Sequence, residues 1–358
     1  MKTVQTTLGA DASAPGYFAF CEAAGEESSS FLVIFFRFQG QGMTVNYTAN
    51  SPAEALELLS LSDEQLFASA SHLRTATFGN KVTLCAIINA RSGNCGMDCR
   101  FCSQSRHNHT PIEVFSLLPD EELRARILAL AEQPVARIGI VTSGGALSGE
   151  EFERLAGVLQ SLPESARKRV CASLGRLDAS QLALLADIGL DRYHHNLETS
   201  REFYPSVCTT QTWSQRSDTV ARVRKAGMTA CTGGLFGLGE SWHDRIDFAF
   251  SLKEMGVNNV PINFLHPHPK TPLAGQPPLA ASEALRIIAL FRHILPRATL
   301  RVCGGRPLVL GQRQKEIFHA GANALMTGDY LTTHGRGLAD DLAMIADLGL
   351  EVDCVSHC

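Results

Sequence analysis

The chain has 358 residues, of which 45% are hydrophobic and 19% charged, with a net charge of −4 at pH 7. This length allows one large domain or two average ones, and the composition is that of a folded protein with a sizeable core. The small negative charge and the lack of a basic block give no electrostatic support for binding to nucleic acid or, through a polybasic segment, to a membrane surface.

Membrane spans, secretion and disulfides are not indicated either. The densest apolar run, at 31–36, is far shorter than the ~20 residues that span a bilayer, and the polar residues after Lys2 do not form a signal peptide. Eleven cysteines, an odd number, in a long chain without such a signal indicate metal binding or catalysis in a reducing cytoplasm.

The two ends of the chain are predicted to lie outside the main domain. Residues 1–42 combine an Ala/Gly/Ser/Glu-rich stretch with an isolated apolar patch and carry no helix or strand boundaries, so we expect a poorly ordered extension. Residues 43–79 predict a helical segment, in which Ser51 before Pro52 is typical of a helix N-terminus. Residues 351–358 are expected to form a C-terminal tail.

Between residues 80 and 350, an apolar β-branched run followed by a helical pattern recurs eight times. The predicted strands are 82–90, 136–143, 169–175, 192–198, 229–237, 259–267, 299–305 and 324–330. Eight units in about 270 residues favour an α/β fold of the (βα)8 TIM-barrel type. A doubly wound open sheet is the alternative, but the Gly-rich dinucleotide turn is missing after the first strand. In both folds, function belongs at the C-terminal ends of the strands.

The loop after the first predicted strand carries Cys95, Cys99 and Cys102 in the pattern C-x3-C-x2-C. Three thiolates can hold three irons of a 4Fe–4S cluster and leave the fourth open to the amine and carboxylate of S-adenosylmethionine (SAM). The alternative is a structural zinc site completed by His107 or His109. Zinc-binding cysteines usually occur as two separated pairs, so the pattern favours the cluster.

This motif resembles that of the radical SAM enzymes, and further segments narrow the resemblance to the biotin synthase family. The resemblance covers about residues 50–350 and includes, in chain order, SGNC at 92–95, CSQS at 102–105, YHHNLETS at 193–200, GGLFGLGE at 233–240, VPIN at 260–263 and LTT at 331–333. It implies radical insertion of sulfur into dethiobiotin at two unactivated carbons, which gives biotin. It also implies an electron donor such as flavodoxin or ferredoxin, a homodimer and a cytoplasmic location.

Five positions are implied to bind SAM. Ser143 and Gly144 end the second predicted strand, where small residues let the backbone approach a ligand. Phe101 resembles the aromatic residue that faces the adenine, with loop packing as the alternative. Glu198 is implied to bind the ribose hydroxyls, and Arg216 matches an arginine that pairs with the SAM carboxylate, with a surface arginine as the alternative.

The implied substrate site also draws on the fourth predicted strand. His194, Asn196 and Glu198 alternate and therefore share a face, and polar groups inside a barrel are costly unless they bind something. Better-known members have Asn and Asp where this chain has His194 and Glu198. Tyr193 and His195 are expected to point outward. The resemblance assigns to the substrate Asn196, Asn263, Thr332 and Thr333. No acid or base is expected, because an unactivated C–H bond requires radical abstraction by a cofactor.

A second, auxiliary iron–sulfur cluster is implied as the sulfur donor. Cys171, Cys231 and Arg301 match three of its ligands, but Gly139 stands where the family pattern has a cysteine on the second strand. Cys303 lies two residues after Arg301, faces the same way and is predicted to replace the missing ligand, with a small core residue as the alternative. The cluster is 2Fe–2S or 4Fe–4S, and this set of three thiolates favours 4Fe–4S.

The remaining cysteines are given structural interpretations. We expect Cys85 to pack in the first strand, Cys208 to lie in the loop before a helix, and Cys354 and Cys358 to belong to the tail. Two competing functions stay open. A barrel enzyme of the hydrogenase-maturase or methylornithine-synthase type need not have the auxiliary site, and a non-catalytic iron–sulfur carrier would not need polar residues lining a lumen.

Overall fold

The computed structural model describes residues 35–36, 44–45 and 47–354. Most of the predicted extension and the end of the predicted tail, including Cys21 and Cys358, lie outside these residues. In the predicted extension, β1 (Phe35–Phe36) pairs antiparallel with β2 (Thr44–Val45), which lies at the start of the predicted helical segment.

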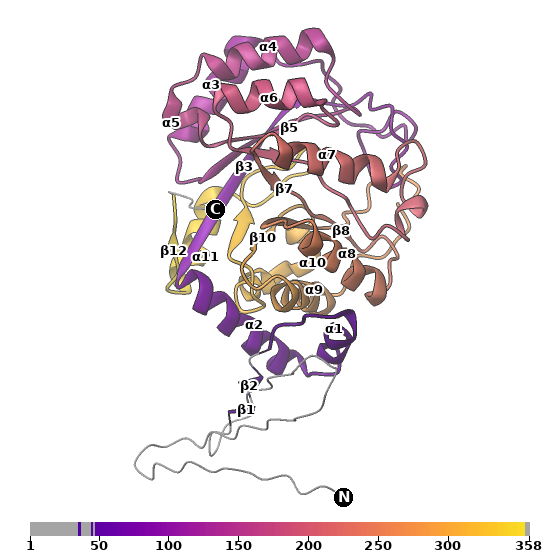
Figure 1. Ribbon diagram of the computed structural model, residues 1–358, viewed down its shortest axis with the longest axis vertical. Coiled ribbons are helices and arrows are strands. Elements are labelled where there is room, and N and C mark those ends of the chain that lie inside the picture. The colour runs from indigo at the N-terminus through magenta and orange to yellow at the C-terminus, as the bar shows by residue number, and fades with distance from the viewer. Residues whose placement is uncertain (1–34, 37–43, 46, 355–358) are drawn as a thin grey trace, which may run out of the picture.

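The predicted helical segment contains two helices. In α1 (Pro52–Leu58), the Ser51 hydroxyl accepts a hydrogen bond from the Glu54 amide and Pro52 is the first helical residue, as predicted. Next, α2 (Asp63–Phe78) begins with a capping box between Ser62 and Gln65. Both helices pack on the later helix α9 (Ala281–Ile294), at the lower end of the molecule in Figure 1.

Eight parallel strands close into a barrel within the described residues, which confirms the predicted fold. In chain order they are β3 (Lys81–Arg91), β4 (Arg137–Thr142), β5 (Val170–Ser173), β6 (Arg192–His194), β7 (Thr229–Cys231), β9 (Asn259–Phe264), β10 (Thr299–Val302) and β11 (Ala324–Met326). The ring closes because β10 pairs with β9 on one side and with β11 on the other, and β11 pairs with β3.

Helices cover the outside of the barrel (Figure 1). They are α3 (Asp120–Ala131), α4 (Gly149–Gln160), α5 (Glu164–Arg167), α6 (Ala179–Ile188), α7 (Trp213–Lys225), α8 (Trp242–Glu254), α9, α10 (Arg306–Leu310) and α11 (Leu338–Asp347), with short 3-10 turns η1 (Tyr204–Ser206) and η2 (Gly311–Ile317). None of the helices in the described part of the chain is long and apolar enough to cross a bilayer.

Most of the barrel strands end one to four residues before the predicted runs, and three regions show further differences. The fourth run is a regular strand only as far as His194, and further along it Glu198 adopts a left-handed conformation (φ 73°). The fifth run is divided into β7 and β8 (Gly234–Phe236) around Gly233, where an added Cβ would lie 1.9 Å from the Pro261 carbonyl oxygen. In the predicted tail, β12 (Glu351–Val352) pairs with the start of β3.

Candidate functional site

A cavity of about 410 Å³ occupies the barrel, within the 300–1,000 Å³ typical of small-molecule sites. Inward residues of the strands and the loops that follow them form its wall. Every residue that the sequence analysis assigned to a cluster, to SAM or to the substrate lines this cavity: Cys95, Cys99, Phe101, Cys102, Ser143, Gly144, Cys171, Asn196, Glu198, Arg216, Cys231, Asn263, Arg301, Cys303, Thr332 and Thr333. Their roles remain predictions.

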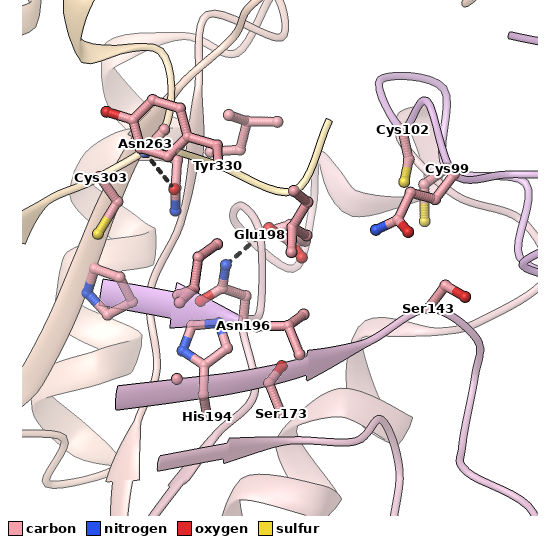
Figure 2. A pocket seen from close by; sticks show the side chains of 18 of the residues that line it. Cys99, Cys102, Ser143, Ser173, His194, Asn196, Glu198, Asn263, Cys303 and Tyr330 are labelled. Carbon is pink, nitrogen blue, oxygen red and sulfur yellow. Dashed lines mark hydrogen bonds between the residues drawn. The ribbon is translucent and has the colours of Figure 1, made fainter. Parts of the chain in front are cut away.

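The cavity has two chemically different ends. Figure 2 shows Cys99 and Cys102 on one side and Cys303 with Asn263 on the other, with Asn196 and Glu198 between them. The end that we call the outer end consists of loops after the strands. The other end, which we call the inner end, consists of residues within or directly after strands β5, β7 and β10, and we define it by Cys171, Cys231, Arg301 and Cys303.

The backbone of the cysteine loop, residues 95–102, is held by hydrogen bonds from the segment that follows it. The Cys95 amide donates to the Gln104 carbonyl (3.0 Å), and the Cys95 carbonyl accepts from the Arg106 amide (2.9 Å). The Asn108 side chain donates to the carbonyls of Cys99 (3.0 Å) and Cys102 (2.8 Å). The loop conformation is therefore fixed by the protein's own groups.

Asp98, which the sequence analysis missed, fastens this loop to the segment before α7. Its Oδ1 accepts hydrogen bonds from the amides of Thr209 (2.9 Å) and Thr210 (3.1 Å) and from the Cys208 thiol (3.1 Å). Burial acts to raise the pKa of Asp98, but hydrogen bonds from the Thr209 hydroxyl, which also donates to this carboxylate, and from Thr210 and Cys208 outweigh it and hold that pKa well below its usual range. Only its position inside the C-x3-C-x2-C motif could have drawn attention to it.

A buried cation and a carboxylate face the middle of the cavity. Arg216 donates to the Tyr204 hydroxyl (2.8 Å) and the Asn196 carbonyl (2.8 Å), and lies 3.4 Å from the Glu198 carboxylate. The side chains of Arg216 and Glu198 are 11% and 13% exposed, so the surface-arginine alternative is wrong. Burial acts to lower the pKa of Arg216, but Glu198 and Tyr204 outweigh it and raise that pKa.

At the end of β4, the Ser143 hydroxyl donates to the Gly93 carbonyl (2.6 Å), so its side chain supports the loop after β3. Gly144 adopts a left-handed conformation (φ 110°), which a side chain would disfavour. The part of this segment that remains open to a ligand is therefore its backbone.

Amide side chains and threonines line the opposite wall. The Asn263 amide donates to the Gly234 carbonyl (3.1 Å) and accepts from the Gly304 amide (3.0 Å). The hydroxyls of Thr332 and Ser103 share a hydrogen bond of 2.8 Å, which ties the loop after β11 to the cysteine loop. These contacts orient the side chains and close the cavity on that side.

The inner end is rich in buried sulfur and positive charge. The Arg301 guanidinium donates to the Cys231 sulfur (3.5 Å), and the Cys303 thiol contacts the Arg301 carbonyl (3.5 Å). A hydrogen bond joins the sulfurs of Cys171 and Cys231, and it raises the pKa of Cys171 and lowers that of Cys231. Burial raises the pKa of Cys303. At Gly139, an added Cβ would lie 2.9 Å from Cγ2 of Ile87.

Two residues border the cavity although the sequence analysis gave them no role there. His195, which was expected to point outward, is buried at the cavity wall, and burial lowers its pKa well below the usual value. Cys85 lies in the first strand as expected and also lines the cavity. Tyr193 packs outside the cavity as expected, with its hydroxyl donating to the Gly175 carbonyl (2.7 Å). Among the described residues, no three His, Cys, Asp or Glu side chains are gathered closely enough for one metal ion.

Comparisons with known proteins match most of the barrel. Residues 90–252 match the model of the radical SAM superfamily, and residues 261–351 match that of the biotin and thiamin synthesis associated domain. The chain is 78% identical over 316 residues to a biotin synthase of Desulfovibrio desulfuricans, covering 88% of this chain and all of that one. It is 45% identical to a biotin synthase of Pelotomaculum thermopropionicum, covering 84% and 94%.

Solved structures also share the fold, and two of them illustrate the likeness. One is a methylornithine synthase, with a TM-score of 0.73 and 20% identity over 85% of this chain and 94% of that one. The other is an FeFe-hydrogenase maturase from Carboxydothermus hydrogenoformans, with a TM-score of 0.75 and 20% identity over 86% and 77%. At this identity the likeness concerns the fold alone.

Proposed function

The chain belongs to the biotin synthase family of radical SAM enzymes, and from this premise we propose which residues bind SAM, dethiobiotin and the sulfur donor. The observation that carries the proposal is the shared cavity, which brings the cysteine loop, a buried cation, inward amides and the sulfur-rich inner end together. A cluster, SAM and a substrate must meet in one enclosed space for radical chemistry, because water and side reactions have to be excluded.

The outer end fits the 4Fe–4S cluster and SAM. Cys95, Cys99 and Cys102 would each hold one iron, on a loop whose backbone is already fixed. Arg216 would pair with the SAM carboxylate and Glu198 with the ribose hydroxyls, since both charges are buried and face the cavity. When bound, SAM and the reduced cluster supply the 5′-deoxyadenosyl radical that abstracts hydrogen from an unactivated carbon.

The SAM site is completed by three further residues. Ser143 and Gly144 would offer backbone groups to the SAM amine, because the Ser143 hydroxyl is engaged with Gly93. Phe101 lines the cavity and packs against the hydrophobic core, and its ring would lie against the adenine.

Dethiobiotin would bind between the two ends. The Asn263 side chain donates one hydrogen bond to Gly234 and accepts one from Gly304. Its second N–H and the second lone pair of its oxygen can therefore bind the cyclic urea. Thr332 and Thr333 would cover the substrate from the last loop, and Asn196 would contact it from the end of β6. These groups hold the reacting carbons still while the enclosed cavity excludes water.

The inner end would hold the auxiliary cluster, which serves as the sulfur donor. Cys171, Cys231 and Cys303 supply thiolates, and Arg301 lies against Cys231 as a ligand or as a hydrogen-bond donor. Three thiolates with no cysteine at Gly139 favour a 4Fe–4S cluster over 2Fe–2S. We further propose a flavodoxin or ferredoxin as electron donor, a homodimer and a cytoplasmic location, where the cysteines of the described chain would stay reduced.

The proposed outer site is tested by replacing Cys95, Cys99 or Cys102 with alanine in turn. Each variant should lose the formation of 5′-deoxyadenosine from SAM under reducing, anaerobic conditions, because each removes the ligand of one iron. A Cys354→Ala variant, which removes an exposed thiol far from the motif in the sequence, should keep full activity. Activity that survives in all three loop variants would contradict the assignment.

A further inference from the structure

We propose that Cys85 is a fourth thiolate ligand of the auxiliary cluster, so that Cys85, Cys171, Cys231 and Cys303 together hold a 4Fe–4S cluster. The inference rests on the proposed function of the inner end as a cluster site. It completes that site, because one cysteine for each iron is the usual ligand set of a 4Fe–4S cluster.

The position of Cys85 on β3 places its side chain in the lumen. The residues on either side of it, Leu84 and Ala86, are buried in the core that lies under the helices. Cys85 and Ile87 occupy the alternate positions and line the cavity. Cys85 is 7% exposed, so it is a thiol on the cavity wall that solvent scarcely reaches.

The strand register brings Cys85 to the level of Cys303. Leu325 on β11 pairs with Val302 of β10 on one side and with Leu84 of β3 on the other. Cys303 and Cys85 are each one residue further along their strands, and the next residue of β11, Met326, is the partner of Cys85. The two cysteines therefore approach the cavity from strands that flank β11.

The groups around Cys85 are the same ones that define the inner end. Its thiol interacts electrostatically with Cys231 and Arg301, and Cys171 and Cys303 each interact with Cys85. The cavity wall here also contains Arg137 and Arg192, both buried. Several buried guanidinium groups around four thiols suit an anionic cluster with thiolate ligands.

The local packing explains why the ligand comes from β3. A side chain at Gly139 would collide with Ile87, its partner on β3, so β4 has no room for a ligand at that level. Cys85 lies two residues before Ile87 on the same face and is the neighbour of Arg137. The thiolate that β4 cannot supply is therefore available from the adjacent strand. Arg301, which already donates to the Cys231 sulfur, is left as a hydrogen-bond donor.

The test isolates the auxiliary cluster in the full-length chain. In a parent variant with Cys95, Cys99 and Cys102 all replaced by alanine, anaerobic loading with ferric and ferrous iron and sulfide should give about four irons per chain. Adding Cys85→Ala should leave one iron without its thiolate and change the Mössbauer spectrum of that iron site, because three thiolates can still hold a 4Fe–4S cluster. Adding Cys85→Ser, which nearly preserves the side-chain size, should keep the iron but shift the spectrum of one iron site. Adding Cys354→Ser should change neither quantity.

The outcomes separate this inference from the proposed function. If the parent binds iron and both Cys85 variants keep its iron count and spectrum, Cys85 is a core residue and only the present inference fails. If the parent binds no iron at all, the auxiliary site itself is wrong and both proposals fail. If Cys85→Ala does not fold, the spectrum of Cys85→Ser decides, because an unshifted spectrum rules the ligand role out.

Discussion

Asn263 allows a prediction in which binding and stability change by separate, calculable amounts. Its amide spans two strands, donating to the Gly234 carbonyl at 3.1 Å and accepting from the Gly304 amide at 3.0 Å. Asn263→Ala removes both bonds and any contact with the cyclic urea. A lost neutral hydrogen bond costs ~0.5–1.5 kcal/mol, which corresponds to a dissociation constant for dethiobiotin raised about two- to tenfold.

The same substitution should lower the free energy of unfolding. The Gly234 carbonyl and the Gly304 amide lose their partner, at about 1–3 kcal/mol for each group that stays dry. Water can enter the cavity beside them and replace part of the lost hydrogen bonding, so we expect less than the ~2–6 kcal/mol of two dry groups, about 1–2 kcal/mol in total.

Isothermal titration with dethiobiotin in the presence of SAM gives the binding change, and denaturant unfolding gives the stability change. Asn80→Ala, at an exposed asparagine bonded to Glu351, is a control that should leave dethiobiotin binding unchanged. A normal dissociation constant together with lowered stability would show that Asn263 only supports the barrel, and would refute the proposed substrate position.

Three further predictions concern the two ends of the cavity. Arg216→Gln should raise the dissociation constant of SAM about tenfold or more, since a lost hydrogen bond to a charged group costs ~1.5–3 kcal/mol; unchanged SAM binding in a titration would contradict the carboxylate assignment. Cys303→Ser should alter the Mössbauer spectrum of the auxiliary cluster and lower biotin formation, and unaltered spectra with full activity would rule out its ligand role. Asp98→Asn should loosen the cysteine loop, because an amide accepts fewer hydrogen bonds than a carboxylate. We expect iron to leave the first cluster faster when its loss is monitored by absorbance, and an unchanged rate would contradict this role of Asp98.

The family resemblance supplied Cys171, Cys231 and Arg301, and strand alternation supplied two further sets of inward residues. Alternation predicted that His194, Asn196 and Glu198 share one face and that Cys303 faces the same way as Arg301, and all of these residues line the cavity. The same rule gave no role to His195, which follows the last residue of β6 and also borders the cavity.

Other features lay beyond sequence reasoning for different physical reasons. Cys85 lies in the first predicted strand, where a single cysteine is equally consistent with a small apolar core residue. Only the closed barrel brings it near the other thiols. The partners of Asp98, Thr209 and Thr210, are more than 100 residues away in the chain. No local pattern could reveal that contact.

The central claim is that this cavity joins radical chemistry to sulfur insertion. The most direct measurement is product analysis after anaerobic turnover of the cluster-loaded chain with SAM, reductant and dethiobiotin. We predict biotin together with 5′-deoxyadenosine in the wild-type chain, and neither product in the Cys95→Ala variant. Formation of 5′-deoxyadenosine without biotin, with both clusters present and an intact electron supply, would contradict the account.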